Sequence, residues 1–199
     1  MSLFTIGCSI HTPQTFIANL KQHSIQAVVD CRSTPYSKIT PHFNKESIHT
    51  LLKQHSISYL SFQHEFGARR KEPPAYQYGR VHFPFVIQLP QFQEGVQRIR
   101  VGLDKQLNIA LMCTEKHPID CHRFLLVSHH LEQVLQLQTQ HILFDGSLLT
   151  TPQLESLMID KLKLQPTLFE QSLIPLIEKA YTILGNNIAY IEQQTEPTN

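Results

Sequence analysis

The residues best suited to chemistry gather in one stretch, which runs from Leu107 to Arg123. Cys121 is a candidate nucleophile, because a thiolate is intrinsically nucleophilic. Glu115 could act as an acid, a base or an orienting group, and His122 could carry protons near neutral pH. Arg123 would pair with a phosphate, sulfate or carboxylate. These residue types predict a site for an anionic ligand, with Cys121, Glu115 and His122 as its candidate catalytic residues.

The elements around this stretch would place those side chains at the start of a helix. Residues 109–112 form an apolar run typical of a buried parallel strand, and a short polar loop follows as far as Pro118. Asp120 is the expected N-cap of a helix whose first turn starts at Cys121. Free N–H groups and the helix dipole favour an anion there, and they would lower the pKa of Cys121 from about 8.5 by about one unit or more.

A structural interpretation of the same stretch stays open. Cys113 could be a core residue at a strand end, because free cysteines are commonly buried and inert. His122 would then be solvated, and Glu115 would pair with Arg123.

Two further strands would bring polar side chains to the same edge of the sheet. Ser9 follows the first expected strand, and Asp30 and Arg32 follow the second. Ligands in parallel sheets bind at the carboxyl ends of the strands, so these residues could converge with the central loop in one crevice. The alternative for Asp30 and Arg32 is a structural ion pair or a loop cap.

Apolar runs and helix starts alternate along residues 1–147. The expected strands are 3–6, 27–29, 57–62, 109–112 and 139–144, and the expected helices start at Thr12-Pro13, Asn44, Pro90 and Asp120. Strands that alternate with helices of this length indicate βαβ units. We therefore predict an α/β fold with three α/β/α layers and a mainly parallel sheet of about five strands.

A long irregular stretch after residue 62 carries positive charge and aromatic rings. Arg69 and Arg70 could clamp phosphates, and Tyr76 and Tyr78 could stack on a base. Long loops inside compact domains are often binding loops. The alternative is a solvated basic loop.

After residue 147 the pattern becomes helical. Thr151-Pro152 and Pro166-Thr167 are helix starts, and Pro175 would kink the second helix. Residues 148–191 are thus predicted to form a C-terminal helical extension, which could pack on the sheet or form a homodimer contact. Residues 192–199 are polar and are predicted to be a disordered tail.

Composition narrows the class of protein. A chain of 199 residues with 41% apolar side chains can bury a sizeable core, whereas a formal charge of +1 disfavours strong non-specific nucleic-acid binding. No run approaches the roughly 20 apolar residues of a membrane helix. With no signal peptide and four widely spaced cysteines, the chain is expected in the cytoplasm with reduced thiols.

Several common motifs are absent from the sequence. It contains no G-x-G-x-x-G, no P-loop lysine motif and no C-x-x-C, which disfavours the corresponding nucleotide-binding and redox functions. Cys113, Cys121, His122 and Cys31 could bind zinc if they met in space. Because the spacing of the cysteines is not a standard zinc pattern, we assign neither a metal nor a cofactor.

Short blocks along the chain resemble the domain of unknown function 488 family. The central block is Met112-Cys113-Thr114-Glu115, then Pro118, then Cys121-His122-Arg123. Further blocks in the family's order are Thr5-Ile6-Gly7-Cys8-Ser9, Val29-Asp30-Cys31-Arg32 with Pro35 and Ser37, Phe43-Asn44, Ile57-Ser58-Tyr59, Phe66-Gly67-Ala68-Arg69 and His141-Ile142. Cys8, Cys31 and Ala68 replace the family's usual histidine, valine and glycine. The resemblance implies a compact α/β fold in an intracellular, mostly prokaryotic setting, and it implies no settled activity.

Two functions are compatible with these residues. The first is an enzyme that acts on a small phosphorylated, nucleotide-like or thiol-transfer substrate, with Cys121 as nucleophile or anion contact, Glu115 for proton transfer, and Arg123 and Arg32 as clamps. The second is a regulatory module that holds a nucleotide or a nucleic-acid end without turnover. In both, an anionic small molecule or nucleotide is the expected partner.

Overall fold

A computed structural model describes residues 2–9, 11–166 and 172–192. Its main sheet has six strands in the order β3-β2-β6-β1-β7-β8. All neighbours pair in parallel except β7 and β8, which are antiparallel. The strands are β1 (Ser2–Gly7), β2 (Ala27–Asp30), β3 (Ser58–Ser61), β6 (Asn108–Cys113), β7 (Thr139–Ile142) and β8 (Leu148–Thr150).

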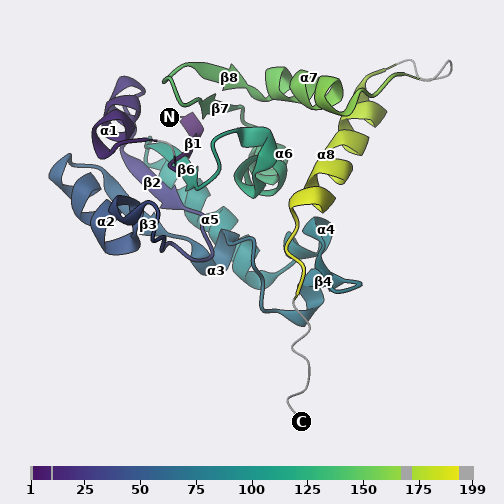
Figure 1. The fold of residues 1–199 in the computed structure, drawn as a ribbon, viewed down its shortest axis with the longest axis horizontal. Helices are drawn as coiled ribbons and strands as arrows, with labels where there is room; N and C mark the ends of the chain where they lie inside the picture. The colour runs from purple at the N-terminus through teal and green to yellow at the C-terminus, as the bar shows by residue number, and fades with distance from the viewer. Residues whose placement is uncertain (1, 10, 167–171, 193–199) are drawn as a thin grey trace, which may run out of the picture.

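Helices cover both faces of this sheet (Figure 1). On one face, α1 (Pro13–Gln22) and α2 (Lys45–Gln54) bury Phe16 and Leu52 against the strands. On the other face, α5 (Pro90–Asp104) and α6 (His129–Leu135) form a second apolar core with β2 and β6. The predicted three-layer α/β/α fold with a mainly parallel sheet is confirmed.

Local sequence explains why the helices begin where they do. Thr12 caps α1, because its hydroxyl accepts the N–H of Thr15 while the Thr15 hydroxyl accepts the N–H of Thr12. Proline at the first turn of α1 and α5 has its φ angle already fixed for a helix. Asn44 precedes α2 as expected, but its side chain accepts the N–H of Ser37 instead of capping the helix.

The long connection between β3 and α5 contains short elements. They are α3 (Gln63–Phe66), η2 (Pro73–Ala75), β4 (Tyr76–Gln77), β5 (Arg80–Val81) and α4 (Phe83–Val86). The small β4-β5 hairpin also holds the end of the described chain, because the N–H of Val81 donates to the carbonyl of Tyr190 and the N–H of Glu192 donates to that of Gly79. A further short helix, η1 (Pro41–Phe43), precedes α2.

The C-terminal extension packs on the segment that follows β6. Its helices α7 (Thr151–Leu162) and α8 (Ile174–Ile188) form a third apolar cluster with Phe124 and Leu125 (Figure 1). The extension therefore shares a core with the α/β domain.

Three expectations about the region after residue 142 were wrong. The second helix of the extension begins at Ile174, not at Pro166, and Pro175 lies in its first turn, where it favours the start of the helix instead of kinking it. The short strand β8 was not predicted. Residues 167–171 and 193–199, which include most of the predicted tail, lie outside the described residues.

Among the residues that the structure describes, no helix has the length and apolar character needed to cross a membrane.

Candidate functional site

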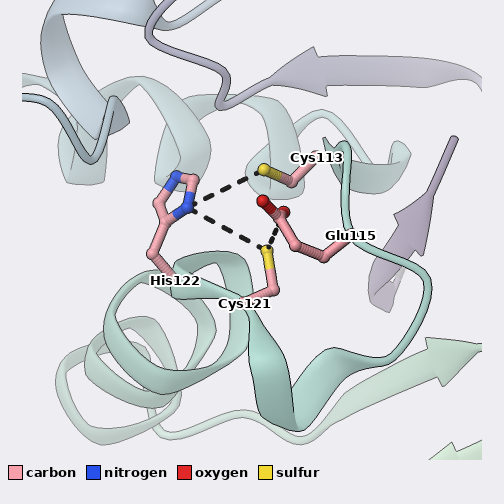
Figure 2. A group of neighbouring side chains, drawn as sticks. All are labelled: Cys113, Glu115, Cys121 and His122. Atoms are coloured by element: carbon pink, nitrogen blue, oxygen red, sulfur yellow. Dashed lines mark hydrogen bonds between the residues drawn. The ribbon is translucent and has the colours of Figure 1, made fainter. Parts of the chain in front are cut away.

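Four side chains that could take part in catalysis or metal binding meet beyond the carboxyl end of β6. They are Cys113, Glu115, Cys121 and His122, and one ligand atom from each lies within 4.8 Å of the others. Figure 2 shows Cys113 at the strand end, Glu115 in the following loop, and Cys121 and His122 where the next helical segment begins. We call these four residues the thiol cluster. The predicted catalytic residues are thus brought together, and Cys113 joins them.

The backbone places Cys121 at a helix start, but not through the predicted cap. Asp120 ends the short helix η3 (Pro118–Asp120) and forms a surface ion pair with Lys161 of α7. Cys121 is extended (φ −141°, ψ 138°), and its carbonyl accepts the N–H groups of Phe124 and Leu125. Its Sγ accepts the N–H of Arg123 at 3.4 Å. Cys121 is therefore itself the capping residue, and the prediction for Asp120 was wrong.

The helical segment behind the cluster is irregular. Residues Arg123–Ser128 form a turn of π-helix, labelled η4, which continues into α6. All six of its residues are buried. Such turns are rare and often occur at functional sites.

Cys121 donates a hydrogen bond to Glu115. Their Sγ and Oε2 atoms are 2.8 Å apart and hydrogen-bonded. Burial raises the pKa of Glu115, and the charge of Cys121 raises it further. Burial also opposes ionisation of Cys121, but the hydrogen bond from Cys113 and the charges of Arg123 and His122 outweigh it and hold that thiol's pKa well below its usual value. The arrangement thus makes Cys121 easier to ionise, and Glu115 harder to ionise, than the isolated side chains.

Cys113 completes the sulfur pair and stays protonated. Burial and the hydrogen bond to Cys121 both raise the pKa of the Cys113 thiol well above its ordinary value. One thiol of the pair is thus a donor and the other an acceptor.

His122 joins the cluster to the neighbouring strand. Its Nδ1 lies 3.7 Å from Sγ of Cys113 and 4.0 Å from Sγ of Cys121, while Nε2 lies 3.0 Å from the carbonyl oxygen of Cys31. A carbonyl only accepts, so Nε2 carries a hydrogen and Nδ1 is the atom that faces the sulfurs. Burial opposes the charged ring, but the hydrogen bond and charge of Cys121 raise its pKa. The interpretation of a solvated His122 was wrong, because the ring is buried.

Arg123 holds the loop that carries Glu115. Its side chain is 0% exposed, and its guanidinium donates to the carbonyl oxygens of Glu115 at 2.8 Å and Lys116 at 3.4 Å. The alternative of a Glu115–Arg123 ion pair was also wrong, because the contact uses the backbone of Glu115 and not its carboxylate. Among the described residues, the buried Nε of Arg123 has no partner.

Asp30 and Arg32 form a closed pair near the same edge. Nε and Nη2 of Arg32 donate to the two carboxylate oxygens of Asp30 at 2.8 and 2.6 Å, and the hydroxyl of Tyr59 also donates to Asp30 at 2.8 Å. Both side chains are buried. This geometry matches the structural alternative given for the two residues.

The two arginines of the long loop have different positions. Arg70 is buried, and its guanidinium donates to the carbonyls of His64, Glu65 and Gly67 and pairs with Glu72. Arg69 is exposed and lies over the ring of Tyr190 at 5.7 Å. It helps to line a pocket of about 500 Å³, whose other lining residues are Ser33, Thr34, Gln63, His64, Arg70, Lys71, Glu72 and Tyr190.

The chain at the end of β1 holds the loop of the thiol cluster through backbone hydrogen bonds. The N–H groups of Cys8 and Ser9 donate to the carbonyls of Cys113 and Thr114. A Cβ on Gly7 would lie 2.1 Å from the carbonyl oxygen of Glu115, so only glycine allows this approach. Ser9 therefore meets the loop through its backbone. The role of Gly7 was missed, although its place at a strand end was a usable signal.

Fold and site together define a parallel-sheet α/β protein with a buried thiol cluster at the end of its central strand. The chain belongs to the family described as Domain of unknown function DUF488, whose model matches residues 12–129, more than half of the chain. This match contains β2, β3, β6 and the whole thiol cluster, and it confirms the resemblance. Comparison with curated proteins and with solved structures finds no significant match.

Proposed function

We propose that the protein is an enzyme whose reactive group is the Cys121 thiol, with Glu115 as its proton-transfer group. The 2.8 Å contact between Sγ of Cys121 and Oε2 of Glu115 carries this proposal. A cysteine nucleophile needs an adjacent base, and a carboxylate at hydrogen-bond distance is such a base. Of the other buried cysteines, Cys113 also interacts with the Glu115 carboxylate, but its pKa is raised well above the ordinary value, whereas Cys31 donates to a backbone carbonyl.

The surroundings of the sulfur suit nucleophilic chemistry. In the proposed step, the proton of Cys121 passes to Glu115, the sulfur forms a bond to an electrophilic centre, and the bond from that centre to its leaving group breaks. The carboxyl then returns that proton to the leaving group. The N–H of Arg123 and the thiol of Cys113 stabilise the sulfur while it is charged.

The proposed substrate is a small anion, either phosphorylated or nucleotide-like. Three of the four candidate arginines are occupied by protein acceptors, so Arg69 is the one of these that remains for a ligand. Its pocket also contains Lys71, and Ser33 in the pocket wall lies two residues after Cys31, whose carbonyl contacts His122. The pocket and the cluster therefore share one segment of chain.

Alkylation kinetics test the proposed enzyme. The reduced, metal-free protein would be treated with iodoacetamide at neutral pH, and each modified cysteine located by peptide mass spectrometry. All four cysteines are buried, so exposure alone predicts similar slow rates. We expect Cys121 to react at least about tenfold faster than Cys8, because Cys121 has a hydrogen-bonded carboxyl to take its proton. Glu115→Gln should remove this advantage. Equal rates, or rates unchanged by Glu115→Gln, would overturn the proposal.

A second candidate is a binding module without turnover. It is favoured by the position of Arg69, which is exposed in a pocket of its own rather than in the thiol cluster. Calorimetric titration with inorganic phosphate and with AMP tests it. Under this candidate, Arg69→Ala weakens binding whereas Arg100→Ala, at an exposed position of α5, does not, and Cys121→Ser leaves binding unchanged. Equal binding by the two arginine variants would contradict an anion site at Arg69.

A further inference from the structure

The thiol cluster has the donor set of a metal centre. It offers two sulfurs, one imidazole nitrogen and one carboxylate oxygen, all within 4.8 Å of one another. Three of the four residues are buried, and Glu115 is partly exposed. Two sulfurs with nitrogen select zinc-like ions, whereas calcium and magnesium prefer sites made of oxygen.

The spacing of these atoms fits one tetrahedral ion. With zinc bonds of about 2.3 Å to sulfur and about 2.0 to 2.1 Å to nitrogen, two ligands of one tetrahedron lie about 3.6 Å apart. Nδ1 of His122 is 3.7 Å from Sγ of Cys113 and 4.0 Å from Sγ of Cys121. The shorter contact of Cys121 with Glu115 is bridged by a proton, which an ion would replace.

The outer contacts orient the ligands as metal sites require. Nε2 of His122 is fixed by the carbonyl of Cys31, which leaves Nδ1 directed at both sulfurs. Metal-binding histidines almost always use their second nitrogen in this way. The N–H of Arg123 points to Sγ of Cys121 and would stabilise a bound thiolate. These two contacts are independent of the cluster's own hydrogen bonds.

We propose that Cys113, Cys121 and His122 bind a zinc-type divalent cation, with Glu115 as a fourth, exchangeable ligand. Binding would release the thiol protons, so the site would hold two thiolates and a carboxylate around the ion. The buried guanidinium of Arg123, which donates to the carbonyl of Glu115, offsets the remaining negative charge. The partly exposed Glu115, flanked by the exposed Thr114 and Lys116, gives the ion a path from the surface.

The proposed metal site uses the same side chains as the proposed enzyme, but its evidence does not depend on that activity. Three firm ligands and one replaceable ligand are the pattern of a zinc ion that keeps a position for another molecule. A structural zinc, in contrast, would keep Glu115 bound. The exchangeable position is therefore part of the proposal.

Metal titration of the full-length protein tests the inference. The protein, stripped with a chelator and kept reduced with a phosphine, would be titrated with Zn²⁺ in competition with a chromophoric chelator, and separately with Co²⁺. We expect one ion per chain, with a sulfur-to-cobalt charge-transfer band and the strong visible bands of tetrahedral Co²⁺. Cys113→Ser and Cys121→Ser should weaken Zn²⁺ binding by more than about 100-fold, the upper range for losing even an outer contact.

Controls separate a specific site from loss of folding. Cys8→Ser, a buried cysteine outside the cluster, should bind Zn²⁺ like the wild type. If the cluster cysteine variants do not fold, as judged by circular dichroism, the cobalt spectrum of the wild type and of Glu115→Gln decides. Glu115→Gln should retain the sulfur band and lose affinity less than the cysteine variants.

The metal site and the enzyme can fail separately. A pale octahedral cobalt spectrum without a sulfur band, or equal Zn²⁺ affinity in Cys8→Ser and Cys121→Ser, would overturn the metal site. Preferential alkylation of Cys121 in the stripped protein would still support the enzyme in that case. Tight Zn²⁺ binding together with uniform, slow alkylation would support the metal site and reject the thiol nucleophile.

Discussion

Among single residues, Arg123 illustrates how a buried cation can serve the backbone. Its fork-shaped guanidinium holds two carbonyls of the loop that carries Glu115, while its own N–H caps the sulfur of Cys121. A lysine at this position keeps the charge but cannot reach two acceptors in fixed geometry. The loop conformation thus depends on the shape of the side chain as well as its charge.

Arg123→Lys should therefore lower stability. At least one of the two part-buried carbonyls would lose its donor, which costs up to about 1 to 3 kcal/mol. Urea unfolding followed by circular dichroism measures the change. Arg100→Lys on the exposed face of α5 is the matched control and should have little effect. A loss no greater than that of the control would show that the loop does not depend on the guanidinium.

The buried His141 makes stability depend on pH. Its two nitrogens contact the hydroxyls of Thr5 and Thr151, and burial, together with the charge of Arg123, lowers its pKa to about 3. Between this value and the ordinary 6.5, the unfolded chain binds a proton that the folded chain does not. Its contribution to stability is therefore complete above about pH 6.5 and declines as the pH falls towards 3, by at most about 1.4 kcal/mol per pH unit.

His141→Gln isolates this effect. Urea midpoints would be measured from pH 7 down to pH 4, and the decline should begin at about pH 6.5. The midpoint should fall less steeply with pH in the variant than in the wild type. His64→Gln, at an exposed position, should keep the wild-type slope. Burial also lowers the pKa of His129, to about 4, so part of the decline should remain in the variant. Identical slopes in wild type and His141→Gln would contradict the assignment.

Between elements, the end of β1 and the loop after β6 are in close backbone contact. Gly7→Ala would place a methyl group 2.1 Å from the carbonyl oxygen of Glu115. The methyl carbon is fixed by the backbone of residue 7 and the oxygen belongs to the backbone of Glu115, so neither can rotate away. Overpacking of this kind costs about 1 to 3 kcal/mol. Besides lowering the urea midpoint, the change should reduce the preferential alkylation of Cys121.

Gly102→Ala provides the matched control for this change. Gly102 lies in α5, and an added Cβ would meet only the flexible end of the Ile109 side chain. Alanine also favours a helix over glycine by about 0.5 to 1 kcal/mol, so this variant should be neutral or slightly stabilised. Equal behaviour of the two glycine variants would mean that the loop is free to move away from β1.

Elements with local signals could be predicted from the sequence. Thr12-Pro13 and Pro90 begin helices as expected, because capping and proline geometry involve only neighbouring residues. Pro175 and β8 could not be assigned correctly. The effect of a proline depends on where its helix begins, and a three-residue strand gains its stability from its partner β7, which local sequence does not encode.

The sequence predicted which residues meet at the candidate site better than it predicted what each of them contacts. Cys121, Glu115 and His122 converge because they flank one strand end. The partners of Arg32, Arg70 and Arg123 could not be inferred, since each guanidinium binds acceptors whose positions depend on loop conformation. For the same reason the sequence did not identify Cys121 as the helix cap.

For the whole molecule, the C-terminal extension should unfold together with the α/β domain. Met158 of α7 is fully buried in the cluster that contains Phe124, next to the thiol cluster in sequence. Met158→Ala should cost about 2 to 5 kcal/mol, whereas Leu157→Ala, at a 39% exposed position of the same helix, should cost much less. Circular dichroism and tyrosine fluorescence should report one coincident transition. Two separate transitions would make the extension an independent unit. Its predicted role in a homodimer stays a prediction.

His122 also connects the sulfurs of Cys113 and Cys121 to the backbone that follows β2. One rigid ring touches the sulfurs through one nitrogen and the main chain of Cys31 through the other. A change at the sulfurs that moves this ring would therefore also alter its hydrogen bond to the backbone after β2. The next residues along that backbone form a wall of the Arg69 pocket. A single imidazole thus forms the physical link between two buried sulfurs and the chain segment that lines a surface pocket.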